Sequence, residues 1–204
     1  MITLHALQYS RAIRVLWLLS DLGQPCNRVD YERTSGFRAP EALARVHPLG
    51  KSPVIEDDGQ KIAESATILR YLVAKYGDDS HQPARGTQAY WRHESLLDYV
   101  EASFAEVALA AILPAFQGKE IPEEAQAALD THLGYIAQEI GSGPFFCDSG
   151  LTLADIQISY LLAMLDRMGL LDGHPQVQAY WQRLQEQPGY IAAVEQAGPM
   201  APPA

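Results

Sequence analysis

The stretch from His47 to Leu69 constrains the fold of this chain more than any other; its sequence is HPLGKSPVIEDDGQKIAESATIL. In its middle stands Asp58-Gly59, a dipeptide typical of tight hairpin turns because glycine readily adopts the positive φ that such turns require. Strand-forming residues flank the turn at 54–55 and 62–63, and a helical pattern follows over 64–76. The stretch therefore predicts a β-hairpin that leads directly into a helix.

Glu64 and Ser65 stand where the second strand of the hairpin gives way to this helix. A helix N-terminus presents backbone N–H groups without intrahelical partners, and its dipole favours negative charge. A hydroxyl and a carboxylate beside those groups form a receptor suited to a ligand that carries both a carboxylate and an ammonium group. An ordinary helix cap is the alternative interpretation of the same pair.

The residues up to 76 follow the element order of a thioredoxin-type α/β domain. A strand is predicted over 2–7, and Ser10 is a good N-cap for a helix over 11–23. A second strand over 26–31 and a short helix over 40–46 then precede the hairpin. A strand–helix–strand unit places its two strands parallel through a right-handed crossover. The predicted fold class is therefore a thioredoxin-like βαβαββα domain, followed by an all-helical domain.

Helical periodicity dominates the second half of the chain. The polar segment 78–86 reads as a linker, so we expect domains over 1–77 and 87–204. Thr152 and Asp155 match a capping box ahead of an apolar run. The proline-rich tail GPMAPPA has little to bury and is expected to fray. Helices are predicted near 87–116, 122–140, 153–168, 175–186 and 188–196.

Charge and composition argue against several kinds of partner. A formal net charge of -10 is unsuited to nucleic-acid backbones and anionic membrane surfaces. The longest apolar run, 107–116, is far shorter than the roughly 20 residues that span a bilayer, and no secretory signal is visible. The 2 cysteines form no CxxC pair, and the 6 histidines have no metal-ligand spacing. We therefore expect a cytoplasmic protein without a metal, nucleic-acid or membrane partner.

Three segments carry a resemblance to a known family. They are the run from Ser10 to Leu16, the stretch 47–69, and the capping box of Thr152 and Asp155. Together they resemble the cytosolic glutathione S-transferases, and both halves of the chain follow that family's order and lengths. The resemblance thus covers essentially the whole chain. The four-residue spacing from Ser10 to Arg14 is similar to the bacterial, serine-type, theta-like branch.

The resemblance implies a glutathione site on the α/β domain. In that family the proline before the third strand is cis, and the backbone of the next residue pairs with the cysteinyl unit of glutathione. The corresponding positions here are Pro53 and Val54. Glutathione would serve as a co-substrate and not as a permanently bound cofactor. The other residues implied, from the glycyl to the γ-glutamyl end of glutathione, are Lys51, Ser52, Glu64 and Ser65.

The implied chemistry requires the thiolate of glutathione, because a thiol with a pKa of about 8.5 is mostly protonated at neutral pH. A hydroxyl donor and a helix N-terminus both favour the anion, and Ser10 would supply both. We therefore expect Ser10 to be catalytic, with a plain N-cap as the alternative. Tyr9 is the second choice, because a tyrosine plays this part in another branch, although earlier relative to the helix. The lack of cysteine at this junction argues against the glutaredoxin-like, omega-like and maleylacetoacetate isomerase branches.

The resulting prediction is a homodimeric detoxification enzyme that conjugates glutathione to a hydrophobic electrophile, or reduces a hydroperoxide with it. Two alternatives stay open. One is a non-catalytic binding or adaptor protein of the same fold, and the other is a passive carrier of apolar ligands that would not need Ser10. The predicted pocket for the second substrate comprises Tyr9, Arg11, Phe104 and Phe116. Core or interdomain packing is the alternative for the two phenylalanines, and a solvated position at the helix start is the alternative for Arg11.

Overall fold

The computed structural model describes residues 1–77, 80–147 and 150–202. The chain folds into two compact units. The first comprises Met1–Asp78 and Gln187–Pro203, and the second comprises Asp79–Glu186. Within the described ranges, every helix is too short or too polar to cross a membrane. Residues 78 and 79 of the predicted linker 78–86 lie outside the described residues.

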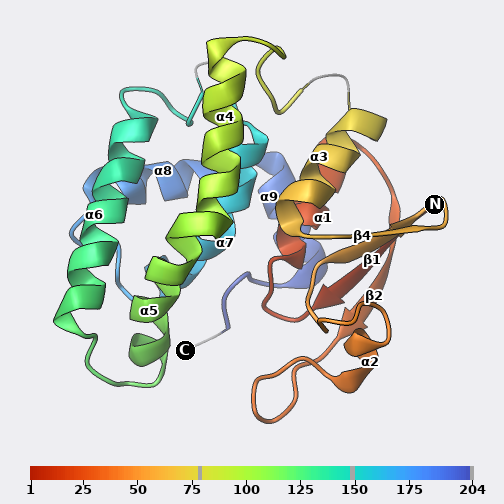
Figure 1. Cartoon of the computed structure of the whole chain (residues 1–204), viewed down its shortest axis with the longest axis horizontal. Helices are drawn as coiled ribbons and strands as arrows, with labels where there is room; N and C mark the ends of the chain where they lie inside the picture. Colours follow the sequence, from red (N-terminus) through yellow and green to blue (C-terminus); the bar gives the residue numbers. More distant parts are fainter. Residues whose placement is uncertain (78–79, 148–149, 203–204) are drawn as a thin grey trace. The chain divides into compact units, whose positions relative to one another are not determined.

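The first unit is built on a four-stranded mixed sheet (Figure 1). Its strands are β1 (Ile2–Leu7), β2 (Cys26–Tyr31), β3 (Val54–Asp57) and β4 (Gln60–Ala63). The strand order is β2-β1-β3-β4, with β1 parallel to β2 and antiparallel to β3, and with β3 antiparallel to β4. Asp58 and Gly59 have φ angles of 46° and 77° and form the turn between β3 and β4, so the predicted hairpin is confirmed.

Among its described residues, the helices of this unit are α1 (Ala12–Asp21), α2 (Glu41–Ala44), α3 (Ser65–Tyr76) and α9 (Pro188–Ala197). α1 packs against β1 and α3, and α9 lies against α1 (Figure 1). Gly189 permits this close approach, because a Cβ atom at that position would lie 2.6 Å from Cδ1 of Trp17. The buried indole of Trp17 also meets Tyr190 edge-on, with ring centroids 5.4 Å apart.

The last helix differs from the predicted domain range 87–204. The segment Gln187–Pro203 belongs to the first unit, because α9 packs along α1. Helical periodicity predicts the helix itself, but it carries no information on which core the helix joins. The described part of the tail, residues 198–202, also differs from the expectation of fraying, since Met200 and Ala201 are only 2% and 9% exposed. Residues 203 and 204 lie outside the described residues.

The second unit is all-helical, which confirms the predicted fold class. Its elements are α4 (Gln88–Tyr99), a π-helical turn (Val100–Phe104), α5 (Ala105–Phe116), α6 (Glu123–Ile140), α7 (Leu153–Arg167) and α8 (Pro175–Gln185). α7 forms the centre of this unit, since it contacts α4, α5 and α8 and is buried throughout residues 153–165. The predicted capping box of Thr152 and Asp155 is present at its start. The π-helical turn inside the predicted helix 87–116 has no counterpart in the sequence pattern.

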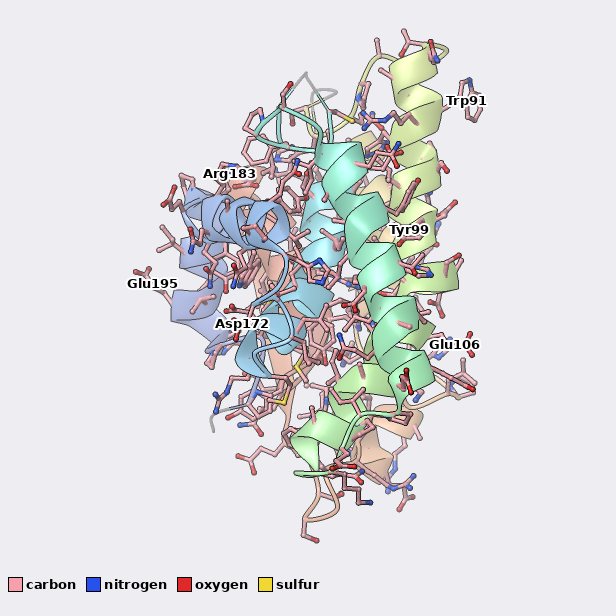
Figure 2. All side chains as sticks on the ribbon, turned by 90° about the vertical axis from the view of Figure 1, so that its left-hand side faces the viewer. Trp91, Tyr99, Glu106, Asp172, Arg183 and Glu195 are labelled. Atoms are coloured by element: carbon pink, nitrogen blue, oxygen red, sulfur yellow. The ribbon has the colours of Figure 1, made fainter. Side chains whose placement is uncertain are left out.

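An aromatic cluster joins α4 to α6 (Figure 2). The Tyr99 hydroxyl lies 2.7 Å from Nδ1 of His132, and the Tyr99 ring stacks on Phe104 with centroids 6.1 Å apart. Burial raises the pKa of Tyr99, so its hydroxyl stays protonated at neutral pH. Trp91 projects away from α4 and is 65% exposed (Figure 2). The cluster therefore belongs to the core of the second unit, whereas Trp91 lies on its surface.

A buried carboxylate fixes the end of β3 to α3. Oδ2 of Asp57 accepts hydrogen bonds from the hydroxyls of Tyr71 at 2.9 Å and Tyr76 at 2.6 Å, and from Nζ of Lys75 at 2.7 Å. Although burial alone would raise its pKa, these donors lower the pKa of Asp57 to about 2. The carboxyl group of Asp57 therefore ionises at a lower pH in the folded protein than in the unfolded chain.

Replacing Asp57 with asparagine is expected to destabilise the protein by about 2 kcal/mol at pH 7, because a buried network loses its charged acceptor. Since the folded-state pKa of Asp57 lies below that of an unfolded aspartate, its contribution is present above pH 4 and is lost as the pH falls towards 2. Urea unfolding at pH 7 and pH 3 checks this. The difference in free energy of unfolding between wild type and variant should be smaller at pH 3. Asp58→Asn is the control, since Asp58 pairs with the same Lys75 but is exposed; an equal effect there would contradict the prediction.

Candidate functional site

Three chain segments that are far apart in the sequence leave the sheet of the first unit at one edge. There Val54 of β3 is paired on both sides, with His5 near the end of β1 and with Ala63 at the end of β4. Ser10 follows β1, Ser52 precedes β3, and Ser65 follows β4. The register of the sheet therefore brings together the segments that carry the predicted catalytic and glutathione-binding residues.

The side chain of Ser52 is hydrogen-bonded to the backbone of β1. Its Oγ accepts a hydrogen bond from the N–H of Leu7 at 3.0 Å and donates to the carbonyl oxygen of His5, also at 3.0 Å. The Ser52-Pro53 peptide bond is cis, as the resemblance implies. The backbone N–H and C=O of Ser52, by contrast, bond to no other residue that the structure describes. What Ser52 can offer a ligand is thus its backbone.

Val54 has a different environment from the one predicted. It pairs with His5 on one side and with Ala63 on the other, and it is 1% exposed. Backbone groups inside an antiparallel ladder point at the neighbouring strands. The structure therefore does not support pairing of the Val54 backbone with a ligand, and Ser52 is the nearest residue with free backbone groups, because Pro53 has no N–H.

Ser10 lies between β1 and α1 with its hydroxyl ready to donate. The residue is 8% exposed, and its Oγ accepts a hydrogen bond from the N–H of Ala12 at 3.2 Å. The other oxygen nearby is Oγ of Ser52 at 3.4 Å, which is a long contact. The Ser10 proton therefore has no strong acceptor within the described part of the chain. The N-cap of α1 is Arg11, one residue later than predicted, and the Arg11 side chain makes no capping hydrogen bond, whereas Ser10 accepts from the first N–H of the helix.

The start of α3 presents unpaired polar groups. Glu64 has a φ of 67°, a conformation that is costly for a non-glycine residue and that turns the chain sharply from β4 into α3. No side chain caps the helix. The Ser65 hydroxyl and the Glu64 carboxylate have no hydrogen-bond partner in the described ranges, and neither does the exposed ammonium group of Lys51. Ser65 is nevertheless 5% exposed, so its side chain is held in place by packing.

A cavity of about 210 Å³ adjoins Ser10 within the first unit. Its lining includes both Ser10 and Tyr9, and the role of Tyr9 beside a second substrate stays a prediction. An ion pair of 2.8 Å between Arg28 and Asp30 borders the cavity, and Arg28 also donates to the carbonyl oxygen of Gln196. The wall of this cavity is therefore partly charged. Arg11 is half-buried but is not part of this lining.

The two phenylalanines predicted for the substrate pocket differ in exposure. Phe104 is 0% exposed and lies in the aromatic cluster with Tyr99 and His132, so it offers no surface to a ligand. The structure does not support its predicted role, because Phe104 lies at the end of the π-helical turn and is buried in the core of the second unit. Phe116 is 43% exposed at the end of α5, and its role stays a prediction.

A reactive thiolate has no evident source in the protein itself. Cys26 and Cys147 are both free thiols. Burial raises the pKa of the Cys26 thiol, and the nearby Arg28 only partly offsets this. Among the described residues, no cluster of histidine, cysteine and carboxylate side chains could hold a metal ion. A thiolate for the Ser10 hydroxyl to stabilise would therefore have to come from a ligand.

Arg33 is a residue of this region that sequence reasoning missed. Its guanidinium group donates to the carbonyl oxygens of Gln8 and Tyr9, immediately before Ser10. Every residue has a backbone carbonyl group, so no sequence motif could have revealed these contacts.

The chain matches two family models. The model described as "Glutathione S-transferase, N-terminal domain" matches residues 1–74, and that described as "Glutathione S-transferase, C-terminal domain" matches residues 100–188. Glutathione S-transferase 3 of Schizosaccharomyces pombe is 33% identical over 180 residues, which cover 78% of this chain and 72% of that protein. Glutathione S-transferase theta-1 of Mus musculus is 28% identical over 168 residues, which cover 76% of this chain and 69% of that protein.

A solved structure agrees with these matches. The crystal structure of a glutathione S-transferase from Actinobacillus pleuropneumoniae superimposes with a TM-score of 0.86 at 27% identity, covering 98% of this chain and 94% of that one. The strand order, the cis bond before Pro53 and the all-helical second unit are thus found together with family-level similarity in both halves. The chain belongs to the glutathione S-transferase family of enzymes.

Proposed function

We propose that this enzyme binds glutathione along the Ser10 edge of the first unit's sheet and activates its thiol through Ser10. The observation that carries the proposal is that the hydroxyl proton of Ser10 has no strong acceptor among the described residues. The neighbouring Ser52 has backbone N–H and C=O groups that bond to no other described residue. A hydrogen bond donated to a thiolate lowers the pKa of the thiol, because it favours the charged form. The thiolate then attacks an electrophilic carbon, so a carbon–sulfur bond forms and the leaving group departs with its electron pair.

The remaining groups suit the rest of the tripeptide. An extended cysteinyl unit would pair with the backbone N–H and C=O of Ser52, as an added strand does at a sheet edge. The γ-glutamyl carboxylate would accept from the Ser65 hydroxyl and from the N–H groups at the start of α3, and its ammonium group would meet Glu64. Lys51 would donate to the glycyl carboxylate in a charge-assisted bond.

We place the enzyme in the serine-type, theta-like branch, with Ser10 ahead of Tyr9 as the activating residue. The ring of Tyr9 stacks on Phe37 with centroids 6.3 Å apart, which commits that side chain to another contact. The electrophile would enter beside Ser10, on the side of the cavity that Tyr9 lines. A homodimer remains our prediction, and sedimentation of the purified protein tests it.

Replacing Ser65 with alanine is expected to weaken glutathione binding about tenfold, because a charge-assisted hydrogen bond contributes roughly 1.5–3 kcal/mol. Calorimetric titration of glutathione into the wild type and the variant measures this. The pH at which bound thiol ionises should stay unchanged, since Ser65 is assigned to the other end of the ligand. Ser95→Ala is the control, because Ser95 is exposed on α4 in the second unit.

Two results would count against the proposed function. One is a wild-type protein that shows no heat of glutathione binding and no glutathione-dependent turnover across a broad panel of electrophiles. The other is equal weakening of glutathione binding by Ser65→Ala and by Ser95→Ala, which would mean that the start of α3 does not bind glutathione.

A further inference from the structure

Arg33 cross-links the turn that precedes Ser10 to the loop after β2. It stands just beyond the end of β2 and is half-buried. Its Nε donates to the carbonyl oxygen of Gln8 at 2.9 Å, and its Nη2 donates to that of Tyr9 at 2.8 Å. Its Nη1 donates to the carbonyl oxygen of Phe37 at 2.9 Å. One planar guanidinium group therefore connects the turn after β1 to the loop after β2.

The loop that carries Arg33 is itself closed. The N–H of Thr34 donates to the carbonyl oxygen of Arg38 at 2.8 Å, and the N–H of Arg38 donates back to Oγ1 of Thr34 at 3.2 Å. The N–H of Phe37 bonds to the carbonyl oxygen of Thr34 at 2.8 Å. These hydrogen bonds give the segment 34–38 a compact, closed conformation; we call this segment the platform.

Aromatic contacts hold the turn after β1 against this platform. The guanidinium carbon of Arg33 lies 4.4 Å from the centroid of the Phe37 ring, within the range of a cation–π interaction. The Tyr9 ring lies on the Phe37 ring at an interplanar angle of 12°. Arg33, Phe37 and Tyr9 thus form one stack, and the same guanidinium group bonds to the backbone of Tyr9 and Phe37.

The backbone of Tyr9 requires such a restraint. Its φ of 51° lies in the left-handed region, which is unfavourable for residues other than glycine and persists only where neighbouring groups hold it. Ser10 follows directly, so the direction in which its hydroxyl points depends on this conformation. Lysine could not replace the arginine here, because a point charge cannot reach several carbonyl oxygens in one plane.

We propose that Arg33 is a positioning residue for the thiol-activating turn of this enzyme, a role that rests on the function proposed above. It acts through the carbonyl oxygens of Gln8 and Tyr9, and it sets the place of the Ser10 hydroxyl without touching glutathione. Loss of this link allows the turn to relax towards negative φ at Tyr9. A displacement of about 1 Å at a reacting group costs roughly a hundredfold in rate, so a small relaxation has a large effect.

The test is the ultraviolet absorbance of bound glutathione thiolate against pH, together with kcat and KM, in wild type, Arg33→Gln and Arg33→Lys. Arg33→Gln should raise the thiol pKa by about one unit, a tenfold loss in the ionisation constant, and should lower kcat at neutral pH at least tenfold. The Kd for glutathione should change less than about threefold, because the groups assigned to its ends lie on other segments. Arg33→Lys should fall between wild type and Arg33→Gln.

Arg38→Gln is the matched control, since Arg38 lies in the same loop and its guanidinium group has no partner in the described part of the chain. It should behave as wild type does. An unshifted thiol pKa in folded Arg33→Gln would overturn the inference while leaving the proposed function intact. If Arg33→Gln does not fold, folded Arg33→Lys decides in the same way. A wild-type protein without bound thiolate below the pKa of free glutathione would overturn the proposed function, and this inference with it.

Discussion

Replacing Ser10 with alanine is expected to lower kcat for glutathione conjugation about a hundredfold at pH 7, with little change in the Kd for glutathione. The Ser10 hydroxyl is ordered by the N–H of Ala12 and has no strong acceptor for its own proton within the described residues. It therefore gives up only the long contact with Oγ of Ser52 when it stabilises developing negative charge. Removing one such preorganised donor from an active site typically costs a factor of about 10²–10³. Because the loss acts through ionisation of the thiol, it should shrink as the pH is raised.

Two further variants make this result specific to Ser10. Ser20→Ala removes a serine hydroxyl from the other end of α1 and should leave kcat unchanged. Tyr9→Phe keeps the ring that stacks on Phe37 and removes only the hydroxyl, so it should lose much less activity than Ser10→Ala. Steady-state rates and thiolate absorbance against pH measure all three. A Tyr9→Phe variant with the larger loss would transfer the activating role to Tyr9.

The hairpin, its turn and the helix after it could be predicted from the sequence because each depends on local chemistry. Asp58-Gly59 supplies the positive φ angles of the turn, and strand-forming residues flank it. The same holds for the capping box at the start of α7, whose two partners are three residues apart. Candidate donors at the Ser10 edge were also visible, since serine, glutamate and lysine carry their chemistry in the residue type.

The contacts that arrange these donors are different in kind. The Ser52 hydroxyl bonds to the backbone of β1, and Arg33 bonds to the backbone of Gln8 and Tyr9. The partner in each contact is a backbone group, which any residue type supplies, so no spacing of residues in the sequence predicts the contact. The π-helical turn that contains Phe104 is likewise not marked by hydrophobic periodicity. Sequence therefore indicated which groups could act, whereas the fold decides which of them are free to do so.

Replacing Asp155 with alanine is expected to destabilise the protein by about 4 kcal/mol, the largest effect on stability that we predict. Asp155 is 0% exposed. Its Oδ2 accepts hydrogen bonds from the N–H and the hydroxyl of Thr152 at 2.8 and 2.7 Å. Its Oδ1 accepts from the N–H of Phe146 at 3.0 Å and from the hydroxyl of Tyr180 at 2.6 Å. Alanine would leave these donors buried without an acceptor, and each unpaired buried group costs roughly 1–3 kcal/mol.

Urea unfolding followed by circular dichroism measures this loss, with Asp172→Ala as the control. Asp172 lies on the surface (Figure 2), where an aspartate is expected to contribute less than about 0.5 kcal/mol. Tyr180→Phe removes a single donor, so it should cost only about 1 kcal/mol. In the double variant the two losses should not add, because without Asp155 the Tyr180 hydroxyl is itself an unpaired buried group. Additive losses would mean that Asp155 stabilises α7 alone, whereas a smaller combined loss shows that one carboxylate joins the start of α7 to α8.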